Sequence, residues 1–185
     1  MKTILLGSLA VLTLTLNSMS ATEKAYPQTE VGRIEIKTLP AAIIIASTSD
    51  SGYFDSNNGL FMPLFRYIQR NDIAMTTPVE AAIQPGEMYF YITAHAAADT
   101  LSSTEQIDLQ ELPERRVASI GARGSYNRCN FESAKATLNQ WLAEQENYKA
   151  AGPARGAFWN GPMTPGLFKR FEVHIPVIET DPDEK

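Results

Sequence analysis

Two histidines are the first side chains to consider for chemistry, because imidazole transfers protons near neutral pH and binds transition metals. His95 lies where an apolar run ends, and His174 lies in the alternating segment Arg170–Val177. Successive side chains of a strand point to opposite faces, so His174 should share a face with Glu172 and oppose the apolar set around Val173. Neither histidine belongs to a recognisable metal-ligation motif. We therefore expect Glu172 and His174 to be neighbours in a candidate binding site.

Glu172 is the acid with the clearest functional potential. A carboxylate that is buried without a partner is costly, so burial of Glu172 would imply either a cationic partner or a raised pKa. It could then pair with a cationic ligand or act as a general base. The chain contains no nucleophile elbow, no His-Glu-x-x-His, no phosphate loop and no Rossmann fingerprint. The motifs therefore give catalysis little support, and we assign no catalytic residue and no metal ligand.

Methionine, aromatic and arginine side chains supply the other candidates. Thioethers and aromatic rings form polarizable walls for flat apolar ligands, and a guanidinium binds a carboxylate in a fork. Each of these side chains could equally belong to the core or to the charged surface. The predicted binding residues are Phe61, Met62, Phe65, Arg66, Met75, Tyr91, Tyr126, Trp159, Glu172 and His174.

Cysteine content and charge exclude several classes of function. Cys129 is the only cysteine, so the chain has neither an internal disulfide nor a cysteine-rich zinc or iron–sulfur site. We expect Cys129 to be a small, half-buried residue at a helix start. The net charge is -5, from 16 basic and 21 acidic residues. An acidic chain repels phosphate backbones, so we expect no nucleic acid partner.

Residues 1–21 have the three parts of a secretory signal peptide. A positive start at Lys2 is followed by an apolar middle from Ile4 to Leu16 and by a small-residue exit at Ser18–Ala21. The apolar stretch is shorter than the ~20 residues that cross a bilayer. We expect cleavage after Ser20 or Ala21, export to the periplasm or medium, and no membrane span in the mature chain. A retained N-terminal anchor is the alternative.

The mature chain should be one domain over residues 22–178, followed by an acidic, disordered tail over 179–185. Alternating and β-branched runs indicate strands, and apolar residues three and four apart indicate helices. A linker rich in small residues and acids covers 95–113. The patterns predict strands over 31–37, 41–46, 73–83, 88–93, 116–122, 154–160 and 170–177, a helix starting within 59–62, and a helix over 130–146 capped by Asn130.

Both halves of the chain read strand, helix, strand, strand. Two such units can bury their sheet faces against each other around a shared cleft. We therefore predict an α+β fold with pseudo-twofold symmetry, in which two main helices lie on a distorted antiparallel barrel or sheet. We expect a monomer.

Three stretches together resemble the SOUL haem-binding family. The first is FMPLFRYI at 61–68 followed by IAMTTPV at 73–79. The second is VASI at 117–120 with the Trp141–Leu142 helix end, and the third is WNGPMTPG at 159–166 followed by RFEV at 170–173. Their order and spacing cover almost the whole mature chain. Phe171 departs from the asparagine that the family commonly has there, and no histidine precedes His95 to serve as an N-terminal iron ligand.

The resemblance implies an apolar groove for haem or a related planar tetrapyrrole, with axial ligation of the iron left open. It also implies a relation to gyrase-inhibitor-like multidrug-sensing domains, in which a cleft acid pairs with hydrophobic cations. We therefore expect an exported small-ligand-binding protein. The alternatives are a hydrolase-like enzyme that uses Glu172 as its base, a binder of hydrophobic cations, and an interaction protein with a closed cleft.

Overall fold

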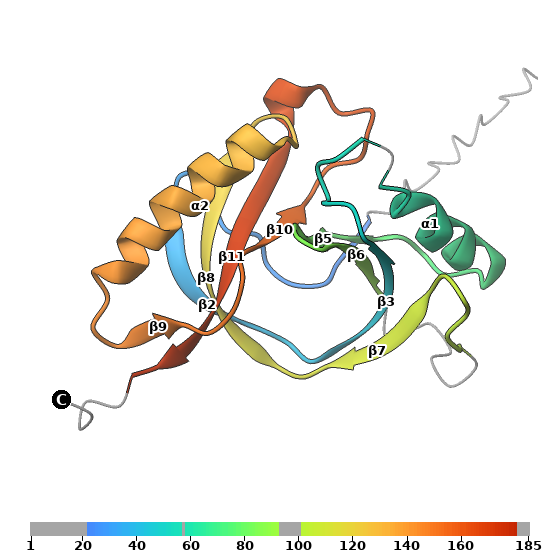
Figure 1. The fold of residues 1–185 in the computed structure, drawn as a ribbon, viewed down its shortest axis with the longest axis horizontal. Coiled ribbons are helices and arrows are strands. Elements are labelled where there is room, and N and C mark those ends of the chain that lie inside the picture. Colours follow the sequence, from blue (N-terminus) through green and yellow to red (C-terminus); the bar gives the residue numbers. More distant parts are fainter. Residues whose placement is uncertain (1–21, 57, 93–100, 181–185) are drawn as a thin grey trace, which may run out of the picture.

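The computed structural model describes residues 22–56, 58–92 and 101–180. A curled antiparallel sheet carries two helices, α1 (Phe61–Arg70) and α2 (Arg128–Ala143) (Figure 1). Its strands are β2 (Ile34–Leu39), β3 (Ala42–Ser49), β5 (Val79–Ala82), β6 (Gly86–Tyr91), β7 (Asp108–Leu112), β8 (Arg115–Arg123), β10 (Arg155–Phe158) and β11 (Arg170–Glu179). The short strand β9 (Tyr148–Ala150) pairs with β11, and β1 (Glu23–Lys24) pairs in parallel with β4 (Thr76–Thr77).

The order of strands shows the predicted pseudo-twofold symmetry. The sheet runs β2-β8-β11-β10-β5-β6-β3-β7, so that β10 and β5 meet at its centre. The first strand of each half pairs with the second strand of the other half, because β2 lies beside β8 and β7 lies beside β3. The predicted α+β fold with two main helices is therefore confirmed, and the two halves exchange their first strands.

Several details differ from the prediction. The single strand predicted over 73–83 is divided into β4 and β5, on either side of Pro78. The segment predicted as a linker contains β7, an edge strand that a sequence pattern with few apolar residues did not reveal. The second helix begins earlier than expected, and its cap is Asn127, whose side chain accepts a hydrogen bond from the backbone N–H of Asn130. Cys129 follows in the first turn and is exposed instead of half-buried, because the buried stripe of α2 starts at Phe131.

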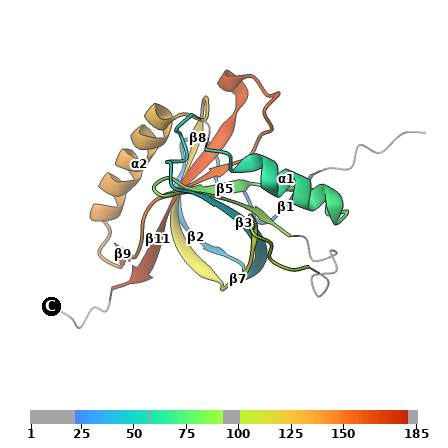
Figure 2. The same ribbon diagram turned by 45° about the vertical axis from the view of Figure 1, so that its right-hand side comes forward.

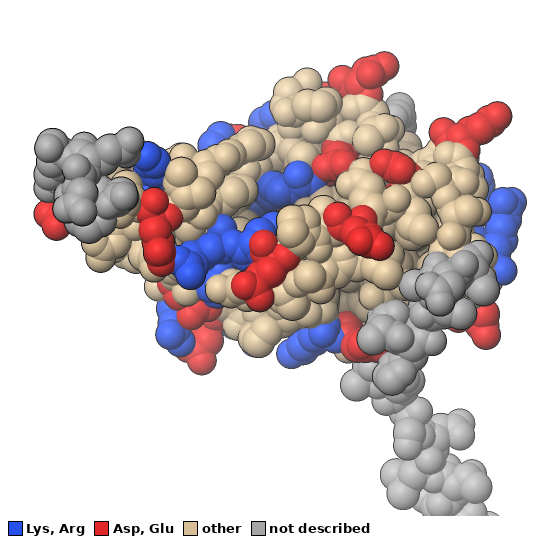
Figure 3. Space-filling view, turned by 90° about the horizontal axis from the view of Figure 1, so that it is seen from below, with Lys and Arg blue, Asp and Glu red and all other residues tan. Residues whose placement is uncertain are grey.

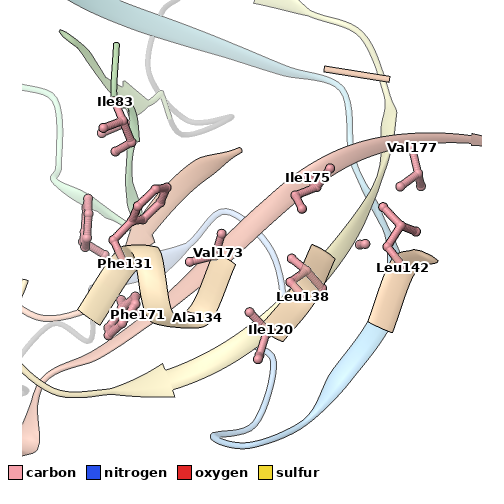
Figure 4. Close-up of a cluster of buried hydrophobic side chains, with 13 residues drawn as sticks. Ile83, Ile120, Phe131, Ala134, Leu138, Leu142, Phe171, Val173, Ile175 and Val177 are labelled. Carbon is pink, nitrogen blue, oxygen red and sulfur yellow. The ribbon is translucent and has the colours of Figure 1, made fainter. Parts of the chain in front are cut away.

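The two helices cover one face of the sheet. Residues Phe131, Ala134, Leu138 and Leu142 repeat at helical spacing and pack on Phe171, Val173 and Ile175 of β11 (Figure 4). Helix α1 buries Leu64, Tyr67 and Ile68 against β3 and β6. This apolar burial fixes both helices, since each large buried side chain contributes roughly 1.5–3 kcal/mol.

The opposite, concave face of the sheet is crossed by residues 25–33, which we call the N-terminal segment (Figures 1 and 2). Its Tyr26 is buried in a cluster with Leu39, Ile44, Tyr89, Tyr91 and Trp159. Glu172 and His174 also face this side, because they alternate along β11 with the residues that pack on α2. Among the described residues, no helix is long and apolar enough to cross a membrane.

Candidate functional site

The structure distributes the ten predicted binding residues over three places. Phe61, Met75 and Tyr126 line one groove on the helix-bearing side of the sheet. Tyr91, Trp159, Glu172 and His174 are buried on the concave face. Met62 and Arg66 are exposed on α1, where Phe65 is half-buried and stacks on Phe61 with ring centroids 5.6 Å apart. His95 lies outside the described residues.

The groove is a largely apolar depression with a volume of about 370 Å³. It lies between the start of α1, the strand pair β5 and β6, and the connection from β10 to β11. Its lining is Thr22, Tyr53, Phe61, Met75, Thr77, Val79, Met88, Tyr126, Phe158, Asn160, Gly161, Pro162 and Lys169. Small-ligand sites usually occupy ~300–1,000 Å³ and are lined mainly by apolar groups with a few polar ones. The groove meets this description.

Three aromatic rings build one wall of the groove. Tyr53 stacks on Phe158 with centroids 5.2 Å apart and ring planes 8° from parallel. The ring centroid of Tyr126 lies 4.7 Å from that of Phe158. Aromatic pairs in such contacts stabilise each other by roughly 0.5–1.5 kcal/mol beyond burial. The wall is therefore held in place before any ligand arrives.

Hydrogen bonds fix the polar edge of the groove. The Tyr126 hydroxyl donates to the carbonyl of Arg170 at 2.7 Å and accepts from the backbone N–H of Asn160 at 2.8 Å. Burial raises the pKa of Tyr126 to about 12, which keeps the phenol neutral near pH 7. Lys169 places its Nζ 4.8 Å from the centre of the Tyr126 ring. The edge thus offers one ammonium group beside a neutral, oriented phenol.

On the concave face, Glu172 is fully buried and has four partners. Its carboxylate accepts hydrogen bonds from the backbone N–H of Thr29 at 2.8 Å and from the hydroxyl of Ser119 at 3.0 Å. Lys37 Nζ lies 2.5 Å from Oε2, and His174 Nε2 lies 2.7 Å from the same oxygen. Burial alone would raise the pKa of Glu172, but His174 and Lys37 outweigh it and hold the pKa at about 2. The expected cationic partner is present, and the alternative of a raised pKa is wrong.

A second buried acid, Glu80, was not predicted. It accepts hydrogen bonds from the hydroxyls of Tyr89 and Tyr91, each at 2.5 Å, and pairs with Arg115 at 3.0 Å and Arg155 at 3.3 Å. Burial acts to raise the pKa of Glu80, yet Arg115 and its other partners lower it below the ordinary value. The sequence does contain a sign of this buried ion pair, because Glu80 is the one acid within the apolar run at 79–83 and a buried acid needs a partner.

The N-terminal segment closes the concave face over both acids. The Tyr26 ring contacts Tyr91, Trp159 and His174, with centroids 5.6, 5.7 and 5.8 Å away. Lys37 also donates to the Pro27 carbonyl and to the Thr29 hydroxyl. The surface seen from below also shows Lys and Arg side chains gathered near the middle of the view, with acidic side chains beside them (Figure 3). The concave face is therefore filled by the chain itself and by its own ion pairs.

One glycine and two unpaired buried nitrogen atoms mark how closely the segment is packed. A Cβ at Gly121 would collide with the carbonyl oxygens of Glu30 and Thr29, so only glycine lets the segment approach β8 here. Trp159 Nε1 and His174 Nδ1 are buried without a hydrogen-bond partner among the described residues. Within the same part of the chain, no group of His, Cys, Asp or Glu side chains could hold a metal ion.

The side chains that line the groove are of types that suit haem. Its apolar and aromatic lining suits a flat macrocycle, and Met75, Met88, Tyr53 and Tyr126 belong to side-chain types that ligate haem iron. Lys169 could pair with a propionate. A volume near the lower end of the usual range means that a ligand as large as haem would extend beyond the groove mouth. The residues that line the groove therefore fit haem, provided that part of the macrocycle extends into solvent.

Comparison with solved structures shows the fold in other proteins. EcmrR in complex with DNA matches 80% of this chain with a TM-score of 0.64 and 16% identity, and the match spans 58% of that chain. The isolated C-terminal domain of EcmrR gives a TM-score of 0.64 and 15% identity, over 80% of this chain and 98% of that one. A hydrolase from Listeria innocua matches with a TM-score of 0.57 and 9% identity, over 81% of this chain and 94% of that one. At such low identity these matches describe architecture alone.

A comparison with family models is more specific. None of the curated proteins compared with the chain matches it. The model described as SOUL heme-binding protein matches residues 22–176, which include both helices, the groove and the concave-face acids. The chain therefore belongs to the SOUL haem-binding family.

Proposed function

We propose that this protein binds haem or a related planar tetrapyrrole in the groove between α1 and the β10–β11 connection. The observation that carries the proposal is the groove itself, a depression of about 370 Å³ with an aromatic wall and a single ammonium group at its edge. Membership of the SOUL family supports the ligand class.

Each lining residue has a role in this proposal. The aromatic wall of Tyr53, Phe158 and Tyr126 would stack on one face of the macrocycle, while Phe61 and Met75 would contact it from the α1 side. Lys169 would pair with a propionate at the solvent edge. When bound, haem would supply a redox-active iron, for which the thioethers of Met75 and Met88 are the softest ligands in the lining.

We propose a binding protein and not an enzyme. A general base must be able to take up a proton near the working pH, and Glu172 has a pKa of about 2 and four partners on its carboxylate. The structural neighbour that is a hydrolase from Listeria innocua shares 9% identity with this chain, which supports a shared fold only.

A hydrophobic cation is a second candidate ligand, favoured by the two buried acids on the concave face. Both Glu80 and Glu172 already have intrachain cationic partners, namely Arg115, Arg155 and Lys37. A ligand could reach them only if the N-terminal segment withdrew. We therefore propose the open groove as the primary site.

We further propose that residues 1–21 direct export, on the basis of their charge and hydropathy pattern. The protein would then act in the periplasm or outside the cell. Intact mass of the protein from the exported fraction tests this, with a start near Thr22 expected. Recovery of the full chain with Met1 retained would contradict it.

Hemin titration followed by the Soret band tests the binding proposal. Met75→Ala and Phe61→Ala should weaken hemin binding by about tenfold or more, because each removes a large apolar wall group. Met62→Ala is the matched control, since Met62 is on the same helix as Phe61 but is 47% exposed and outside the groove lining. Circular dichroism must show that each variant is folded. Equal hemin affinity of the Met75→Ala and Met62→Ala variants would refute the groove as the site.

A further inference from the structure

The connection from β10 to β11 carries three large apolar side chains that face solvent. Met163 is 93% exposed, Leu167 74% and Phe168 61%. They lie on a projecting tip that includes the 3₁₀ turn η2 (Gly166–Phe168), at the top of Figure 1. Solvent-facing apolar groups that cluster in this way mark an interaction surface.

Backbone hydrogen bonds hold this tip in shape. The N–H groups of Thr164, Phe168 and Lys169 donate to the carbonyls of Gly161, Pro165 and Gly166 at 3.2, 2.9 and 3.2 Å. Gly166 packs so closely on Ser125 that a Cβ would collide with the Ser125 hydroxyl. The apolar side chains are therefore presented by an ordered backbone and have no nearby core to enter.

The flank of the tip is basic. Arg170 on β11 lies directly opposite Arg123 on β8, although like charges in this position destabilise a sheet. Neither arginine has an acidic partner among the described residues, and the Lys169 ammonium lies over the ring of Tyr126 and also has no acidic partner among them. The acid near the start of α2, Asp55, is paired with Arg128 at 2.9 Å. Three uncompensated cations thus gather at one end of a chain whose net charge is -5.

We propose that this tip, residues 161–170 with Arg123, docks on the surface of an anionic bilayer. Met163, Leu167 and Phe168 would enter the boundary between headgroups and acyl chains, while Arg123, Lys169 and Arg170 would contact lipid phosphates. A projecting apolar turn flanked by basic side chains matches the surface of an anionic bilayer, where apolar groups and phosphates lie close together. A protein partner would instead need a concave apolar site of its own.

The tip adjoins the groove, since Gly161, Pro162 and Lys169 line it. Docking would therefore bring the groove mouth to the headgroup level, where an apolar tetrapyrrole partitions. The groove could then exchange its ligand with the bilayer. This exchange rests on the proposed function, whereas the docking of the tip on the membrane does not.

Co-sedimentation with vesicles tests the docking. Wild type should bind vesicles of phosphatidylcholine mixed with phosphatidylglycerol, and less so vesicles of phosphatidylcholine alone. Combined Met163→Ser, Leu167→Ser and Phe168→Ser should weaken partitioning about tenfold or more, and Phe168→Trp should preserve it. Combined Arg123→Gln and Arg170→Gln should remove most of the preference for anionic lipid and its salt dependence. All variants are compared in the full chain and in a parallel set that begins at Thr22, which removes the apolar residues 1–21.

Ile178→Ser is the matched control, because this side chain is 50% exposed near the end of β11 that lies away from the tip. Vesicle binding unaffected by the triple serine change would overturn the proposal. Self-association that the triple change abolishes, without any vesicle binding, would also overturn it and assign the tip to a protein contact. Vesicle binding that depends on the tip, in a protein that fails to bind hemin, would support docking and refute only the tetrapyrrole function.

Discussion

Replacing Lys37 by methionine removes the ion partner of Glu172 while keeping an apolar stem of similar length. Lys37 Nζ contacts Glu172 Oε2 at 2.5 Å, the Thr29 hydroxyl at 3.0 Å and the Pro27 carbonyl at 3.2 Å. The change therefore leaves a buried carboxylate with three of its four partners. It also releases two contacts to the N-terminal segment.

The cost can be worked from the pKa of Glu172. A fall in the pKa from 4.5 to about 2 corresponds to about 3–4 kcal/mol of stability, at about 1.4 kcal/mol per pH unit. Deleting one member of a buried pair costs about 3–5 kcal/mol when nothing replaces it. Because His174, Ser119 and the Thr29 N–H remain on the carboxylate, we expect Lys37→Met to lower the free energy of unfolding by about 2–3 kcal/mol.

Urea unfolding followed by circular dichroism measures this difference. Lys135→Met is the matched control, since Lys135 pairs with Glu132 on the surface of α2, where ion pairs contribute at most about 0.5 kcal/mol. Adding Glu172→Gln to Lys37→Met should recover part of the loss, because no buried charge then remains unpaired. If Lys37→Met were no more destabilising than Lys135→Met, the buried network would not hold the concave face together.

Three further predictions concern the same face. Glu172 has a folded-state pKa below its unfolded value, so its contribution to the free energy of unfolding is present above about pH 4.5 and is lost as the pH falls toward 2. Glu172→Gln should therefore flatten that part of a plot of unfolding free energy against pH. The pH dependence that remains should come from Glu80, whose pKa is also lowered. Gly121→Ala should lower the free energy of unfolding by about 1–3 kcal/mol, because the added Cβ would meet the N-terminal segment. Gly161→Ala is the control: its Cβ would enter open space, so the same urea assay should show no change in stability. Tyr26→Ala should lower the free energy of unfolding by about 3 kcal/mol or more, because Tyr26 is a large buried side chain. The change should also increase the quenching of Trp159 fluorescence by acrylamide, since the Tyr26 ring packs on the indole. Unchanged quenching would show that Tyr26 does not cover the indole.

Local patterns predicted the elements well because the physics behind them is local. The period-two alternation placed Glu172 and His174 on one face and Val173 on the other, and the structure confirms that arrangement. Helix α1 begins where Pro63 falls in its first turn, as expected. The edge strand β7 was not predicted, because it pairs with only one strand of the sheet, β3, and an edge strand needs few apolar residues.

The site was predicted less completely because it depends on long-range pairing. Lys37 meets Glu172 across 135 positions of sequence, and no local pattern links them. Sequence reasoning also treated the ten candidates as one pocket, since it could not tell that the face of β11 with Glu172 points away from the face that carries Phe61 and Met75. Whether each of the ten contacts a ligand stays a prediction.

The exchange of first strands between the halves has a consequence for how the chain folds. Strand β2, at Ile34–Leu39, has no partner until β8, at Arg115–Arg123, has been made. The first half therefore leaves the ribosome as an incomplete sheet, and its closure waits for a contact about 80 residues further on, a topology that slows folding. Until then β2 is an unpaired strand whose Ile34 and Ile36 have no core to pack against, so cells should need a holding chaperone for the nascent chain more than for the finished protein.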